Sequence, residues 1–263
     1  MLNTGVEFSE VEVTYGSHRV LKGVSIDIAP GSWHGILGPN GAGKSSLLKT
    51  MIGAVPYRGS VHVGGASVET FSRRERAKIV AYVPQRPIYP QGMAVFDYVL
   101  LGRTPYLGTL GAETESDLAL CWTALADLDM TDFAERDIST LSGGETQRLS
   151  LARVLAQQAD IVVLDEATAS LDVAAQHQVM ELIDTLRTAR GMTVVAAIHD
   201  LTAAAQFCDR VSLLDSGTVV GSGPPGEVLT EELLGDVFEQ SIRVIDVDGS
   251  TVIVSLRSQE VSK

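Results

Sequence analysis

One short segment constrains the fold of this 263-residue chain more than any other: GPNGAGKSS, residues 38–46. It contains the pattern G-x-x-x-x-G-K-[ST], in which glycines let successive backbone N–H groups converge on phosphate oxygens. A short apolar run (33–37) precedes the loop and a helical pattern (45–52) follows it, so the loop is predicted to join a strand to a helix. The alternative is a glycine-rich turn with a solvated lysine, but the strand–loop–helix order favours a phosphate site.

The residues of this loop have distinct expected roles. The lysine is expected to bridge the β- and γ-phosphates of a nucleotide, and the hydroxyl after it to bind Mg²⁺. The helix N-terminus adds a partial positive charge at the same place. The candidate phosphate-binding residues are Gly38, Pro39, Asn40, Gly41, Ala42, Gly43, Lys44, Ser45 and Ser46, with Ser45 also a candidate metal ligand.

A second candidate site lies at the end of the segment IVVLDE, residues 161–166. Its continuous apolar run is typical of a buried strand in a parallel sheet. We expect Asp165 to hold Mg²⁺ through water and Glu166 to orient or deprotonate the attacking water. Alone, the segment could be a strand that ends in surface carboxylates, but the glycine loop upstream favours nucleotide hydrolysis.

Strand-like and helical segments alternate along the chain, which predicts an α/β fold. The longest amphipathic segment (173–190) is predicted to be a helix that Gly191 ends. The C-terminal part is predicted to form a hairpin over about 241–256 that turns at Asp248-Gly249. The other predicted strands are 6–13, 20–28, 33–37, 59–65, 78–85 and 193–199, and the mostly helical stretches are 96–133 and 142–157.

Composition argues against several classes of protein. A net charge of −13 disfavours a non-specific nucleic-acid binder, which needs a basic surface. The two cysteines, Cys121 and Cys208, lack metal-ligand spacing and fit a reducing compartment. The first residues have no signal-peptide pattern, and no apolar run reaches the ~18 residues of a membrane span. Any membrane role is therefore expected to depend on a partner.

The segment LSGGETQR (141–148) adds a family resemblance. Together with GPNGAGKSS and VVLDE, and in this order, it resembles the nucleotide-binding subunits of ABC transporters over nearly the whole chain. The resemblance implies one ATPase domain (1–263), with a P-loop NTPase core, an antiparallel β-subdomain and a helical subdomain at about 86–157. It also implies a head-to-tail homodimer with ATP and Mg²⁺ at the interface, where Ser142, Gly143 and Gly144 contact the γ-phosphate held by the partner.

Other segments match the family residue by residue. Tyr15 lies where the family places an aromatic ring against adenine. Gln85, in YVPQ, matches the Q-loop glutamine that reaches the metal and the water, and His199, in IHDL, matches the histidine that contacts the γ-phosphate. Residues 169–172 match the D-loop, whose Asp172 is expected at the dimer interface. One departure is Ala167, which stands where the family usually has proline and removes no catalytic group.

The segment VLLGRTPYLG (99–108) resembles one branch of the family, the ATPases of importers for ferric siderophores, haem and cobalamin. This implies a multi-span permease, a substrate-binding protein that delivers cargo, and a position at the cytoplasmic face of the membrane. Residues 86–107, including Arg103 and Tyr106, are the expected docking face for the permease.

Several alternatives remain open. The segment 99–108 could simply be a helix end broken by Gly102 and Pro105. The cargo could be zinc, manganese or a phosphonate. The chain could also be a soluble ABC ATPase that works on DNA, ribosomes or iron–sulfur assembly, although its short insert and single cassette disfavour the first two.

Overall fold

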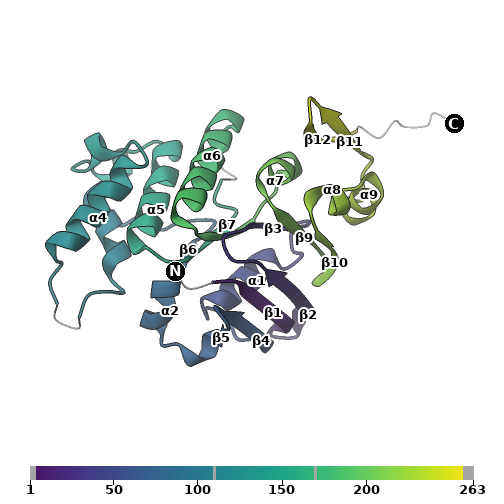
Figure 1. Ribbon diagram of the computed structural model, residues 1–263, viewed down its shortest axis with the longest axis horizontal. Coiled ribbons are helices and arrows are strands. Elements are labelled where there is room, and N and C mark those ends of the chain that lie inside the picture. The colour runs from purple at the N-terminus through teal and green to yellow at the C-terminus, as the bar shows by residue number, and fades with distance from the viewer. Residues whose placement is uncertain (1–3, 109–110, 169–170, 257–263) are drawn as a thin grey trace. The chain divides into compact units, whose positions relative to one another are not determined.

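The computed structural model describes residues 4–108, 111–168 and 171–256 (Figure 1). These residues belong to two compact units, which we describe in turn: unit 1 (4–67 and 195–256) and unit 2 (68–194). The chain passes from unit 2 to unit 1 within strand β8 (Thr193–Ala197). In the described part of the chain, no helix is both long enough and apolar enough to cross a membrane.

Unit 1 contains a four-stranded antiparallel sheet in the order β2-β1-β4-β5 (Figure 1). Its strands are β1 (Val6–Tyr15), β2 (His18–Ile28), β4 (Arg58–Val63) and β5 (Ala66–Ser67). Apolar side chains of β1 are buried on one face, as the alternating sequence predicts. The connection between the first two predicted strands (6–13 and 20–28) is shorter than expected, because Tyr15 pairs with His18 and only two residues connect β1 to β2.

The second part of unit 1 surrounds the buried strand β3 (Trp33–Leu37), which pairs in parallel with β9 (Arg210–Asp215). Strand β10 (Thr218–Gly223) pairs antiparallel with β9. The C-terminal hairpin is confirmed, with Asp248 and Gly249 at its turn in left-handed conformations. The remaining elements are α1 (Lys44–Met51), α7 (Leu201–Phe207), α8 (Pro225–Val228), α9 (Glu231–Phe238), β11 (Ile242–Val247) and β12 (Ser250–Ser255).

Unit 2 contains two parallel strands, β6 (Val80–Val83) and β7 (Ile161–Asp165), paired in register. Helix α2 (Arg73–Ile79) leads directly into β6, and α6 (Val173–Arg190) follows β7. The prediction for α6 is confirmed at both ends: Asp172 caps its first turn, and Gly191 ends it in a left-handed conformation.

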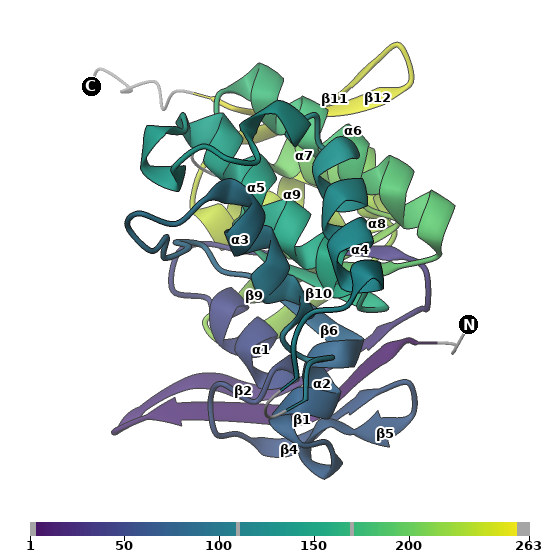
Figure 2. The ribbon, with the colours of Figure 1, turned by 90° about the vertical axis from the view of Figure 1, so that its left-hand side faces the viewer.

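The rest of unit 2 is helical. Helices α3 (Val95–Leu100), α4 (Glu115–Ala126) and α5 (Gly143–Gln157) pack against one another (Figure 2). Short 3-10 turns occupy Val68–Thr70, Leu101–Arg103, Thr131–Phe133 and Ile138–Thr140. The predicted helical stretch 96–133 is therefore interrupted, since helix α4 begins only at Glu115. Strands and helices alternate as predicted, and the α/β class is confirmed.

Candidate functional site

The glycine loop of unit 1 joins β3 to α1, as the sequence predicts. Gly38, Gly41 and Gly43 all have positive φ angles, which L side chains rarely adopt. A Cβ atom on Gly38 would lie 2.1 Å from the carbonyl oxygen of Leu214, so the close approach of two backbones requires glycine there. A Cβ on Gly41 would meet nothing within 4 Å, so this side of the loop is open.

Lys44 organises this loop from inside. Its side chain is buried, and Nζ donates hydrogen bonds to the carbonyl oxygens of Gly38 (2.7 Å) and Pro39 (3.1 Å). The ammonium group is thus held within the curve of the loop, next to the N-terminus of α1. A curved backbone, a helix N-terminus and one cation form a cradle that fits the phosphates of a nucleotide. The first turn of α1 contains no acidic residue that would repel them.

Two other predicted residues of unit 1 are exposed. Tyr15 ends β1 with a side chain that is 46% exposed, so its ring is available for stacking. His199 follows β8 and is also exposed. The residue after it, Asp200, caps α7 by accepting a hydrogen bond from the backbone N–H of Ala203 (3.0 Å). The aspartate in the IHDL segment therefore has a local structural role.

In unit 2, the two carboxylates at the end of β7 are buried, with 2% of Asp165 and 9% of Glu166 exposed. Each accepts a hydrogen bond from β6 or the loop after it. Tyr82 donates its hydroxyl proton to Oδ2 of Asp165 (2.7 Å), and Gln85 donates from Nε2 to Oε2 of Glu166. The structure thus brings the predicted Q-loop glutamine and the predicted catalytic base into direct contact.

The backbone at this point is unusual. Glu166 has a φ of 52°, a left-handed conformation that is uncommon for residues other than glycine and asparagine. Strand β7 ends at Asp165, so Glu166 lies just outside the extended strand. The two carboxylates therefore follow different backbone geometries although they are adjacent in sequence.

Tyr82 is a site residue that was not among those predicted from the sequence. Burial raises the pKa of its hydroxyl and the hydrogen bond to Asp165 raises it further, so the hydroxyl stays protonated at neutral pH and donates a hydrogen bond. A signal was present in YVPQ, because an aromatic hydroxyl three residues before the Q-loop glutamine sits on the strand that pairs with IVVLD.

Helix α5 begins at the predicted signature motif (141–148). Ser142 is its N-cap, and Ser142 and Glu145 form a capping box: the Ser142 N–H donates to Glu145 (2.7 Å) and the Glu145 N–H donates to the Ser142 hydroxyl (3.4 Å). A Cβ atom added to Gly143 or Gly144 would meet nothing within 4 Å. The N-terminus of α5 is therefore an open surface with free space in front of its glycines.

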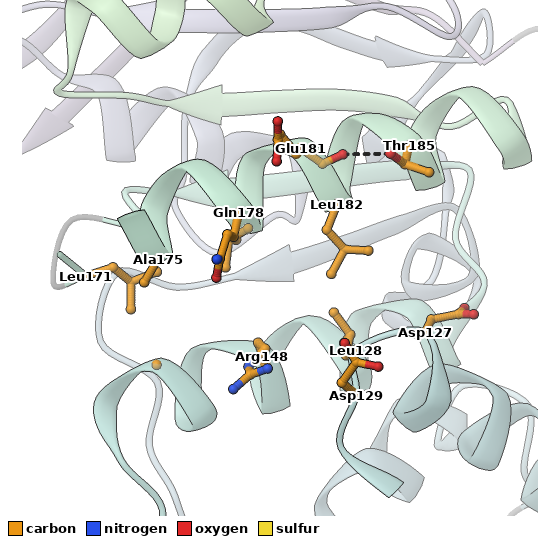
Figure 3. Close-up of a pocket in the computed structure, with 12 residues that line it drawn as sticks. Asp127, Leu128, Asp129, Arg148, Leu171, Ala175, Gln178, Glu181, Leu182 and Thr185 are labelled. Atoms are coloured by element: carbon orange, nitrogen blue, oxygen red, sulfur yellow. Dashed lines mark hydrogen bonds between the residues drawn. The ribbon is translucent and has the colours of Figure 1, made fainter. Parts of the chain in front are cut away.

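A groove of about 460 Å³ lies between α5 and α6 (Figure 3). Figure 3 shows Leu182 of α6 and Leu128 pointing toward one another, with Arg148 on the α5 side. Gly144 and Leu171 also border the groove, so the signature motif and the segment before α6 open onto one hollow. The other lining residues are Asp127, Asp129, Ala175, Gln178, Val179, Glu181 and Thr185.

The remaining predicted residues are accounted for as follows. Asp172 is exposed and accepts a hydrogen bond from the N–H of Ala175 (2.8 Å) as the N-cap of α6. Ala169 and Ser170 of the predicted D-loop lie outside the described residues. Ser45 in unit 1 offers a hydroxyl oxygen, and Gln85 and Asp165 in unit 2 offer amide and carboxylate oxygens, each a type of ligand that Mg²⁺ accepts.

One expectation about the docking face is wrong. Arg103 is 5% exposed, and its guanidinium pairs with Asp117 (2.8 Å), donates to the carbonyl of Ala156 (2.7 Å) and stacks on the ring of Tyr106. The neighbouring Gly102 has a role in packing, because a Cβ there would lie 2.3 Å from the carbonyl oxygen of Arg153 on α5. The GRTPY segment (102–106) thus packs within the helical region, and its arginine is buried and not available to contact a partner.

Comparison with known proteins agrees with this geometry. The family described as "ABC transporter" matches residues 21–169. Over 251 residues the chain is 40% identical to the hemin import ATP-binding protein HmuV of Streptomyces coelicolor, covering 94% of this chain and 89% of HmuV. It is 35% identical to the iron(3+)-hydroxamate import ATP-binding protein FhuC of Bacillus subtilis, covering 90% of this chain and 88% of FhuC.

A solved structure shares the fold over the full length. It is described as an inward-facing conformation of a putative metal-chelate type ABC transporter, and it superimposes with a TM-score of 0.85 at 27% sequence identity. The similarity covers 97% of this chain and 99% of that chain. The arrangement of strands and helices described above therefore recurs in a transporter component.

Proposed function

Since this chain belongs to the ABC transporter family, we propose that it is the ATP-hydrolysing subunit of an importer for an iron siderophore, haem or a cobalamin-type cargo. One observation carries the proposal: import ATP-binding proteins match this chain over at least 90% of its length. The segment 99–108 resembles the same branch of the family. Zinc, manganese and phosphonate importers, and soluble ABC ATPases, are the alternatives that the test below distinguishes.

The glycine loop (38–46), called the phosphate loop from here on, is proposed to bind the phosphates of the nucleotide. Backbone N–H groups of residues 38 and 40–46 and the Lys44 ammonium bind the phosphate oxygens, and the exposed ring of Tyr15 stacks on the adenine. Ser45, Gln85 and Asp165 would hold Mg²⁺, which neutralises charge on the phosphates when bound.

Hydrolysis requires a base next to the γ-phosphate. Glu166 accepts the proton of the attacking water, and His199 contacts the γ-phosphate. In this structure Gln85 donates a hydrogen bond to the Glu166 carboxylate, so one lone pair of the base is already occupied. This hydrogen bond uses the amide nitrogen of Gln85, whereas the proposed metal role uses its amide oxygen.

Each ATP site is completed by a second copy of the chain. The open N-terminus of α5, with Ser142, Gly143 and Gly144, contacts the γ-phosphate held by the partner subunit. Asp172 lies at the same interface. The capping box engages the backbone N–H groups of Ser142 and Glu145, while a Cβ on Gly143 or Gly144 would meet nothing within 4 Å.

The permease docks on the segment 86–107, at the cytoplasmic face of the membrane. Ile88 supports this assignment because 88% of its side chain is exposed, and Leu101 is 45% exposed. Arg103 and Tyr106 contribute by holding this segment in shape. A substrate-binding protein delivers cargo to the permease from the other side.

The test is co-purification followed by transport. The tagged chain is expressed in its own cells, and a multi-span membrane protein is expected in the purified complex. That complex is placed in vesicles, and uptake of ferric hydroxamate, haem, cobalamin, zinc, manganese and a phosphonate is measured beside ATP turnover. Uptake of one of them with ATP consumption supports the proposal. Uptake of only zinc, manganese or phosphonate overturns the cargo class, and a chain that captures no membrane protein overturns the importer assignment.

A further inference from the structure

The hydrogen bond between Tyr82 and Asp165 connects strand β6 to the end of strand β7. The catalytic roles proposed above do not involve Tyr82. Tyr82 pairs with Val163 in the β6–β7 ladder, so the two side chains point to the same face of the strands. Asp165, two residues beyond Val163, points to that face as well. The length of the tyrosine side chain lets its hydroxyl reach forward to Oδ2 of Asp165, at 2.7 Å.

Tyr82 is itself held by the signature helix. The Nη2 group of Arg153 on α5 donates a hydrogen bond to the backbone carbonyl oxygen of Tyr82 (3.0 Å). The same guanidinium lies 5.9 Å from the centroid of the Tyr98 ring on α3. Arg153 thus connects the helix that begins at the signature motif to the strand that carries Tyr82.

The contacts continue into the segment proposed to dock the permease. The rings of Tyr98 and Tyr89 pack with centroids 5.4 Å apart. The Tyr89 hydroxyl donates to the carbonyl of Thr146 (2.8 Å) and bonds the hydroxyl of Ser150 (2.7 Å), both on α5. A continuous set of contacts therefore runs from Tyr89 through Tyr98 and Arg153 to Tyr82 and Asp165.

We propose that Tyr82 is a positioning residue, held by Arg153, that fixes the orientation of the Asp165 carboxylate for metal binding. The proposal rests on the metal role assigned to Asp165 above. A hydrogen bond to one carboxylate oxygen orients the other oxygen, and partners that orient metal ligands typically change metal affinity by about 10–100-fold.

The first test replaces Tyr82 by phenylalanine, which keeps the ring and removes the hydroxyl. Affinity for Mn²⁺ is measured by electron paramagnetic resonance in the presence of a non-hydrolysable ATP analogue, and nucleotide affinity is measured separately in EDTA. Metal affinity is expected to fall about 10–100-fold while metal-free nucleotide affinity is unchanged. Tyr57→Phe, which removes a tyrosine hydroxyl from unit 1, is the matched control and is expected to change neither affinity.

Unchanged Mn²⁺ affinity in Tyr82→Phe overturns the proposal. A parallel fall in melting temperature and in both affinities also overturns it, because it indicates a purely structural residue. Should the variant fail to fold, 3-fluorotyrosine at position 82 of the Glu166→Gln chain keeps the hydroxyl. Its fluorine signal is expected to move when Mg²⁺ is added to the nucleotide-bound protein and to stay in place in Asp165→Asn. A signal that moves equally in both chains contradicts the proposal.

The role of Arg153 is tested by a double-mutant cycle. If Arg153 acts through Tyr82, Arg153→Lys and Tyr82→Phe are expected to lower Mn²⁺ affinity by less in combination than the product of their separate effects. Independent effects contradict the connection. These measurements need only the isolated subunit and no cargo, so their outcome is separate from the outcome of the transport test.

Discussion

The phosphate loop and the GRTPY segment were both prominent in the sequence, and the structure treats them differently. In the loop, glycine φ angles and the hydrogen bonds of Lys44 to Gly38 and Pro39 arise within seven residues of chain. In the GRTPY segment, Arg103 finds its partners at Asp117 and Ala156, which are 14 and 53 residues away. A motif that acts through its own backbone can be predicted from a short stretch of sequence. The contacts of a long side chain depend on which elements pack around it.

The largest effect is expected at Glu166, the proposed catalytic carboxylate. Glu166→Gln keeps the shape of the side chain and removes the base, so turnover should fall about 10²–10⁴-fold while ATP still binds. A nucleotide titration and a steady-state turnover assay on one preparation measure both quantities. Lys44→Ala is the contrasting variant, since it should lose affinity and turnover together. Near-normal turnover in Glu166→Gln would remove Glu166 from the role of base.

Charge reversal at Arg103 tests whether GRTPY is a packing motif. Arg103→Glu places a second carboxylate beside the buried Asp117, and the free energy of unfolding should fall by about 3–5 kcal/mol. Denaturant unfolding measures the change. The exposed Arg86→Glu, in the same segment, is the matched control and should change stability by less than about 0.5 kcal/mol. If the two variants are equally stable, Arg103 is not a buried packing residue and the GRTPY segment (102–106) is not a packing motif.

The same ion pair predicts a response to acid. Hydrogen bonds from Thr114, together with Arg103, lower the pKa of Asp117 to about 2. Because the folded-state pKa lies below the usual value for an aspartate, the stability it contributes is present above pH ~4 and is lost as the pH falls toward 2. Between pH 5 and pH 2 the free energy of unfolding should therefore fall less steeply with decreasing pH for Asp117→Asn than for the wild type. At pH 5 the variant should be the less stable of the two.

A smaller loss is expected at Gly102. The added methyl group of Gly102→Ala would lie 2.3 Å from the carbonyl of Arg153, so α5 has to move away, at a cost of about 1–3 kcal/mol. Thermal unfolding measures it. Gly143→Ala, at the open end of α5, meets nothing within 4 Å and is the control for stability. A Gly102→Ala chain as stable as the wild type would show that the segment is loosely packed.

The smallest effect on stability is expected at Ile88. Ile88→Asp alters a side chain that is 88% exposed, so unfolding should change by no more than about 0.5 kcal/mol and basal ATP turnover should be retained. Cargo uptake by the assembled transporter should nevertheless fall, because an apolar docking contact is replaced by a charge. Undiminished uptake would place the docking contact elsewhere in the segment.

The parts of the site that could be predicted are those that depend on residues close together in the sequence. Gly38 to Ser46, the cap at Ser142 and the helix Val173–Arg190 follow from turn geometry, capping and periodicity, which depend on neighbours in sequence. The contact of Gln85 with Glu166 could not be predicted in the same way, because the two residues are 81 positions apart. Tyr82 was overlooked for a related reason, since its role depends on the partner strand.

The sequence by itself determined the alternation of strands and helices and the phosphate loop, and it predicted the roles of the two carboxylates, because φ restrictions, hydrophobic periodicity and side-chain chemistry are properties of short segments. Only the tertiary structure decided that Arg103 is buried, that Gly102 meets α5 and that Tyr82 holds Asp165. Those outcomes depend on which surfaces meet when strands pair and helices pack, and a buried polar side chain takes whichever partner that packing brings within reach.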